Sequence, residues 1–105
     1  DSIPTSANQE DHVSMGTTSS RQAEMILRNA QWVLAIELLN ASHALEFHLP
    51  LLPGPGVKAA HQALRAVVAP LESDRLMTDD LEAVRNLLIS GTLQRSVEAA
   101  IGKLF

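Results

Sequence analysis

The sequence predicts an all-α fold, in which one long bundle helix is preceded by a polar loop and followed by about three shorter helices. Apolar residues recur at spacings of three and four along most of the chain, as they do on the buried face of a helix. No stretch of four or more residues shows the alternation that is typical of a half-buried strand. Aromatic residues make up only 3% of the chain, so we expect a core of Leu, Ile, Val and Ala, as in packed helices.

Composition and charge exclude several classes of protein and of partner. The 105 residues include 8 basic and 12 acidic side chains, and the net charge of −4 provides no electrostatic surface for nucleic acid or an anionic membrane. The longest apolar run, residues 32–39, is far shorter than the roughly 20 residues that span a bilayer. The lack of cysteine excludes disulfides and thiolate metal sites. We therefore expect a cytoplasmic protein, and because it starts at Asp1 rather than Met, a processed chain or a piece of something longer.

Residues 1–18 are predicted to form a polar loop of the kind found in active sites. Asp, Ser, Thr, Asn, Gly and Pro dominate this stretch, and such side chains compete with regular structure for backbone hydrogen bonds. Its densest polar cluster is Asn8-Gln9-Glu10-Asp11-His12. Carboxylates and imidazole are the usual acid–base groups at neutral pH, so the cluster is a candidate site. The same composition also fits a solvated loop or the start of a helix.

A long helix is predicted to run from Ser19 to Phe47. Ser19 and Gln22 have the spacing of a capping box, and Glu24 and Arg28 form a favourable pair four residues apart. These local signals place the start of the helix after the polar loop.

The middle of this helix is apolar on nearly every side, over residues 32–39. A helix that is apolar on every side must be covered on every side, and a chain of 105 residues has too little other structure to cover it. We therefore expect it to pack against other chains or further chain, so that residues 1–18 and 19–105 form a single structural unit within a larger domain. Glu37 interrupts the run and is either an active-site carboxylate or, as we prefer, a group hydrogen-bonded to a neighbouring chain.

Proline and glycine residues over 50–56 end the long helix, and three shorter helices are predicted to follow. The first covers residues 57–69 and stops before a proline. The next starts near Asp79 and ends at Gly91, which is the kind of residue that follows a helix C-terminus. Thr92 is predicted to cap the last helix.

The remaining histidines do not predict a metal site. His43 and His48 are five positions apart, about 140° around a helix, so their side chains do not converge on one ion. His61 is the lone histidine of the second helix. We interpret all three as surface or partly buried residues.

The residues at the start of the chain resemble a segment of a known family. Residues 1–16, DSIPTSANQEDHVSMG, closely resemble a signature segment near the C-terminal end of the histidine ammonia-lyases, which belong to the aromatic amino-acid ammonia-lyase family. The resemblance continues in VLAIELL at 33–39, PGPG at 53–56 and the region 74–82, and it extends to about Val97. The first block is specific, whereas the later blocks are ordinary helical sequence.

The resemblance implies a step of histidine degradation, in which L-histidine loses ammonia to give trans-urocanate. It also implies a largely helical homotetramer whose active sites draw loops from several subunits. The family's electrophile is a methylidene-imidazolone that forms from an internal Ala-Ser-Gly. This sequence contains no Ala-Ser-Gly, and its nearest string, residues 89–91, fits a helix end. The chain therefore resembles the C-terminal fifth of such an enzyme, and we expect it to form no cofactor and to be inactive without the remaining chain and sister subunits.

Four residues of the polar segment take roles from this resemblance. Glu10 matches the family's active-site glutamate and is the predicted catalytic and substrate-binding residue. Its carboxylate suits a histidine substrate, because it accepts a hydrogen bond from the imidazole and favours the imidazole cation. A second role for Glu10, as the base that removes the β-proton of the substrate, remains open, and the contact with the imidazole is preferred. Gln9 matches a neighbouring polar position and is predicted to orient the substrate or cofactor, whereas Asp11 and His12 are interpreted as supports for the loop.

A second hypothesis is a non-enzymatic helical module that oligomerises or binds a partner through residues 32–39. The apolar excess of the long helix and the missing electrophile support it. A stable, stoichiometric oligomer of the chain alone would favour this hypothesis over a piece of an enzyme.

Overall fold

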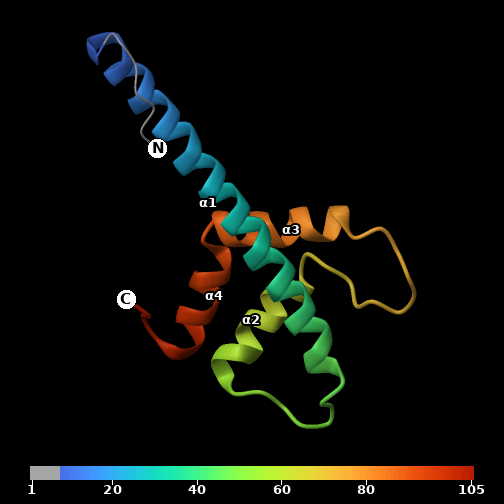
Figure 1. Cartoon of the computed structure of the whole chain (residues 1–105). Coiled ribbons are helices and arrows are strands. Elements are labelled where there is room, and N and C mark those ends of the chain that lie inside the picture. The colour runs from blue at the N-terminus through green and yellow to red at the C-terminus, as the bar shows by residue number, and fades with distance from the viewer. Residues whose placement is uncertain (1–7) are drawn as a thin grey trace. The chain divides into compact units, whose positions relative to one another are not determined.

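The computed structural model describes the backbone of residues 8–105 and the side chains of residues 16–105. Over this range the chain is all-α, with four helices and no strands, which confirms the predicted class (Figure 1). The helices are α1 (Asn8–Glu46), α2 (Pro55–Arg65), α3 (Thr78–Ile89) and α4 (Thr92–Ile101). One long helix is thus followed by three shorter ones, as the periodicity predicts.

The start of α1 corrects one prediction. The helix begins at Asn8, so Ser19 lies inside it rather than at its cap, and the predicted loop is helical from Asn8 onward. No proline occurs between Pro4 and Pro50. Once a helix has nucleated, each further residue adds a backbone hydrogen bond at little cost, so a polar stretch without proline extends it. The first part of the predicted loop, residues 1–7, lies outside the described residues.

The chain divides into two compact units, residues 1–30 and 31–105. In the first unit, the described residues belong to α1. The predicted pair is present there, since Arg28 Nη2 donates to Glu24 Oε1 at 2.9 Å. Both side chains are exposed, so the pair contributes a few tenths of a kcal/mol at most.

The core of the second unit forms where residues 31–46 of α1 meet α2 and α3. Six buried apolar residues make up this core: Ala35, Leu39, Leu64, Val68, Val84 and Leu87. Ala35 and Leu39 of α1 are four residues apart and Val84 and Leu87 of α3 are three apart, as on one face of a helix, whereas Val68 follows the end of α2 and α4 contributes none of the six. Beside the core, α2 and α4 pack against each other, and Gly56 permits close approach because a Cβ there would lie 3.2 Å from Ile101 Cδ1 (Figure 1).

A polar contact also fixes α3 against α1 in the second unit. The Arg85 guanidinium lies 5.0 Å from the centroid of the Trp32 ring, within the range of a cation–π interaction. The same guanidinium donates to Gln31 Oε1 from Nε at 3.2 Å and from Nη2 at 3.0 Å. Stacking and hydrogen bonding together set the position at which α3 crosses α1.

The second helix is shorter than predicted at its C-terminal end. It begins at Pro55, whose fixed φ and missing N–H suit the first turn of a helix. It ends at Arg65 rather than at residue 69, and the Val67 N–H turns back to the Leu64 carbonyl at 3.0 Å. Ala69 precedes Pro70, and the proline ring disfavours the α conformation of the residue before it. The helix therefore ends before the proline.

The turn between α3 and α4 confirms one prediction and corrects another. Gly91 follows the C-cap of α3 with φ of 78°, the left-handed conformation expected after a helix C-terminus. The N-cap of α4 is Gly91 itself rather than Thr92, which is the first residue of the helix. The Thr92 hydroxyl is instead 2.9 Å from the Ser90 hydroxyl.

Replacing Gly91 by Ala is expected to lower the free energy of unfolding by about 1–2 kcal/mol, because an L side chain is disfavoured at positive φ. A Cβ at this position would also lie 2.9 Å from Arg95 Nη1, so the guanidinium must shift. Urea denaturation followed by far-UV circular dichroism measures the effect. The matched control is Gly54→Ala, since Gly54 has φ of −62° and a Cβ there meets no described atom within 4 Å. Equal losses for the two variants would contradict the assigned role of the left-handed turn.

Candidate functional site

The four predicted site residues lie close together at the start of α1. Gln9, Glu10, Asp11 and His12 fall within about one helical turn of each other, in the first unit. Their side chains lie outside the described residues. Their roles in binding and catalysis therefore stay predictions, and their backbone is helical where a loop was predicted.

The apolar segment of α1 in the second unit, residues 32–39, buries Ala35 and Leu39 in the core and is exposed on its other side. Val33 is 55% exposed, Leu34 49% and Ile36 45%, although this is the segment that the sequence predicts to be buried against further chain. Glu37 is exposed beside them. That another chain covers this surface stays a prediction.

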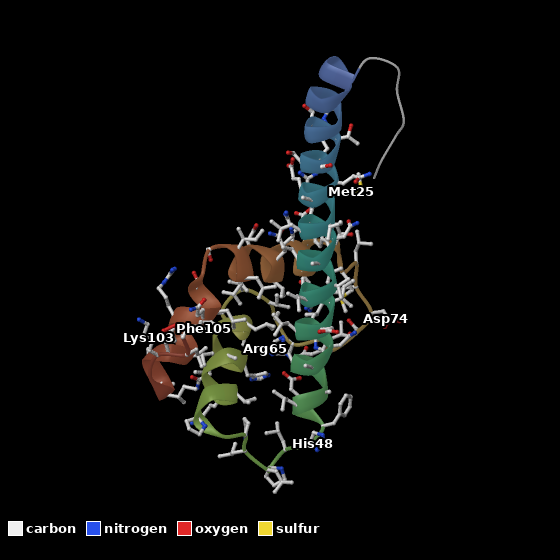
Figure 2. All side chains as sticks on the ribbon, turned by 60° about the vertical axis from the view of Figure 1, so that its left-hand side comes forward. Met25, His48, Arg65, Asp74, Lys103 and Phe105 are labelled. Carbon is white, nitrogen blue, oxygen red and sulfur yellow. The ribbon has the colours of Figure 1, made fainter. Side chains whose placement is uncertain are left out.

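A polar cluster joins the last turns of α1 to α2. Glu46 Oε1 accepts a hydrogen bond from Arg65 Nε at 2.9 Å, and Arg65 Nη2 lies 2.6 Å from the same oxygen. Arg65 is only 15% exposed and lies between the two helices (Figure 2). A third contact runs from Arg65 Nη1 to the Val68 carbonyl at 3.4 Å. The guanidinium thus ties the end of α1 to the end of α2.

Two histidines from different helices complete this cluster. His43 Nδ1 lies 3.4 Å from Arg65 Nη2, and because a guanidinium only donates, this nitrogen is the acceptor of the contact. His61 Nε2 lies 3.9 Å from Glu46 Oε1. The two rings are partly buried, as predicted, and His48 is exposed. The sequence does not reveal the cluster, because its contacts join residues 15, 19 and 22 positions apart on two helices. Within each helix, only the spacings of His43 with Glu46 and of His61 with Arg65 are visible.

This arrangement suits structure rather than catalysis. The Glu46 carboxylate is paired through Oε1 with the guanidinium of Arg65, and this pair holds two helices together. Among the described residues, no group of three or more His, Cys, Asp or Glu side chains is placed to hold a metal ion. The part of the chain that the structure describes also contains no helix long and apolar enough to cross a membrane.

Comparison with known proteins identifies what the chain is similar to. A model of a family described as aromatic amino acid lyase matches residues 1–66, which include the polar segment with Glu10. Histidine ammonia-lyase of Symbiobacterium thermophilum is 53% identical over 99% of this chain, and that of Natranaerobius thermophilus is 49% identical over 99%. Histidine ammonia-lyase of Deinococcus radiodurans is 51% identical over 95% of the chain. The chain spans about a fifth of the length of these relatives. No solved structure matches it.

Proposed function

Because this chain belongs to the aromatic amino acid lyase family, we propose that it supplies the matching fifth of a histidine ammonia-lyase, which converts L-histidine to trans-urocanate and ammonia. The observation that carries the proposal is the 53% identity to a histidine ammonia-lyase across 99% of the chain. The alternative of a non-enzymatic helical module is not favoured, since the relatives that match almost the whole chain are lyases by name.

Within this enzyme, Glu10 is the residue proposed to meet the substrate. Its carboxylate accepts a hydrogen bond from the imidazole of L-histidine and stabilises the imidazole cation. Gln9 orients the substrate beside it, and Asp11 and His12 support the segment. What supports these roles is the match of residues 1–16 to the family signature, inside the region that the family model covers.

The electrophile of the proposed enzyme comes from another part of the polypeptide. The 105 residues contain no Ala-Ser-Gly, so they do not fit as the source of a methylidene-imidazolone. We propose that this chain contributes substrate-binding side chains and helical packing surface to a cytoplasmic homotetramer. The exposed apolar side chains of Val33, Leu34 and Ile36 support the packing role, because surfaces of this kind mark sites of association.

The proposal is tested with a hybrid enzyme, in which this chain replaces the matching fifth of the Symbiobacterium thermophilum histidine ammonia-lyase. We expect the hybrid to have the size of the parent by light scattering and to form urocanate from L-histidine, measured by ultraviolet absorbance. The parent enzyme is the positive control, and a hybrid that carries an unrelated helical segment is the negative control. A hybrid of parental size without urocanate formation would overturn the proposal.

A further inference from the structure

We propose that the outer side of α1 in the second unit packs antiparallel against the same side of a second copy of the chain, so that Glu37 of each copy accepts a hydrogen bond from Asn40 of the other. The proposal rests on the homotetramer proposed above and adds to it one contact face and one direction. The residues that carry it are Val33, Glu37, Asn40 and Ala44, here called the outer seam, and all four are exposed.

The outer seam is one continuous strip along the helix. Its residues follow each other at spacings of four, three and four. At about 100° per residue, these spacings keep the four side chains within about 60° of one another around the helix axis. The core takes Ala35 and Leu39 from the opposite side of the same segment. The outer seam therefore faces away from the core of its own unit.

The outer seam combines apolar edges with a polar centre. Leu34 and Ile36 flank it on its two sides, and each is about half exposed. Exposed apolar surface of this kind marks a site of association. Once water is excluded, however, the Glu37 carboxylate needs a donor and the Asn40 amide needs an acceptor. A purely apolar partner supplies neither group, so the partner must be polar at the same level.

A second copy of the outer seam supplies both groups. In an antiparallel pair with its twofold axis between residues 38 and 39, Glu37 lies opposite Asn40 of the second copy, and Val33 lies opposite Ala44. A carboxylate only accepts and the amide of asparagine donates, so the central groups match. The large side chain of Val33 meets the small one of Ala44, as interdigitating helices require. The twofold symmetry produces each of these contacts twice.

The order of the residues along the outer seam also selects the direction of pairing. A parallel pair would place Glu37 against Glu37 of the second copy, and two facing carboxylates repel each other. It would also place Ala44 against Ala44, and two small side chains leave space unfilled. Only the antiparallel pair joins acceptor to donor and large to small.

Disulfide cross-linking tests the pairing on the complete 105-residue chain, which contains no cysteine of its own. A contact of about three helical turns is small, and cross-linking traps even a weakly populated pair. We expect the double variant Val33→Cys with Ala44→Cys to form a covalent dimer on oxidation, detected by non-reducing gel electrophoresis. Facing positions of packed helices approach the Cα separation of about 4.4–6.8 Å that a disulfide needs.

The matched controls are the two single variants, Val33→Cys and Ala44→Cys. In the antiparallel pair, the two copies of either position lie about 16 Å apart along the helix axis, so neither single variant is expected to cross-link. In a parallel pair, each position faces its own copy and both single variants cross-link. Single variants that cross-link as readily as the double variant would therefore overturn the proposal.

Substitutions of Asn40 test the central hydrogen bond, with the double cysteine variant as the background. Asn40→Lys places a cation opposite Glu37 and is expected to preserve cross-linking. Asn40→Glu places a second carboxylate there and is expected to slow cross-linking roughly tenfold or more, because like charges that face each other weaken association. Both substitutions are at an exposed position of the helix, so the comparison controls for folding. Equal rates for the two variants would contradict the contact between Glu37 and Asn40.

The same cysteine variants of the hybrid enzyme keep the test informative if the chain alone does not fold. The hybrid without the introduced cysteines is the control for cysteines elsewhere in the enzyme. A hybrid of parental size in which the double variant does not cross-link overturns the antiparallel contact, whatever its lyase activity. A cross-linked hybrid without urocanate formation supports the contact and contradicts the proposed lyase, so the two failures are distinguishable.

Discussion

Replacement of Glu10 by Gln in the hybrid enzyme is expected to lower kcat/KM for L-histidine by roughly 10²- to 10⁴-fold, the range that a positioned acid–base group contributes. Glutamine has nearly the shape of glutamate but carries no charge. It therefore neither stabilises an imidazole cation nor accepts a proton. The rate is measured as urocanate absorbance under conditions in which the hybrid without the substitution is active.

The way in which the loss divides between KM and kcat separates the two roles of Glu10. An imidazole contact that is present in both the bound substrate and the transition state raises KM with little change in kcat. A base that acts only in the transition state lowers kcat and kcat/KM equally. The control is Glu24→Gln, since Glu24 is an exposed acidic residue farther along α1 that pairs with Arg28. Unchanged turnover for Glu10→Gln would show that Glu10 does not act in the proposed site.

Local signals in the sequence predict the three short helices and their order, although the end of α2 and the cap of α4 lie elsewhere than predicted. Gly91 marks the end of α3, because a residue in the left-handed conformation is needed there and a single glycine in the sequence indicates it. Leu64 of α2 and Val68 just after the end of that helix are four residues apart in the sequence, and both lie in the core. Such features depend on a few neighbouring residues, so a sequence without any structure contains enough information to place them.

The start of α1 and the polar cluster depend on interactions that local patterns do not contain. A capping box at Ser19 is a real signal, but helix propagation through the preceding polar residues outweighs it. The contact of Arg65 with Glu46 joins two helices across 19 residues of sequence. It results from the packing of α2 against α1, which no single-helix spacing reveals.

The candidate site follows from the identity of residues rather than from their geometry. By composition alone, the cluster at 8–12 fits a solvated segment better than a site. The match of residues 1–16 to a family signature distinguishes between them, and the family model covers the same stretch.

Replacement of Arg65 by Met is expected to lower the free energy of unfolding of the chain by about 1–3 kcal/mol, less than for a fully buried pair because the Glu46 side chain is 33% exposed. The guanidinium is only 15% exposed, and its removal leaves the partly buried Glu46 carboxylate and His43 Nδ1 without their donor. A charge left unpaired away from water costs more than the lost attraction itself, which is why breaking one side of a buried pair is strongly destabilising. Met keeps the length and apolar stem of the side chain, so lost packing contributes little.

The matched control is Arg28→Met, because Arg28 and Glu24 form an ion pair at 2.9 Å on an exposed helix surface, where the side chains are 59% and 68% exposed. That pair is worth about 0.3–0.5 kcal/mol, so its loss is expected to be small. Urea denaturation of both variants, followed by the far-UV circular dichroism signal, gives the comparison. The double variant Glu46→Leu with Arg65→Met is expected to recover much of the stability, since no charge is then left unpaired. If the double variant is as unstable as the sum of its single changes, desolvation of Glu46 does not explain the loss.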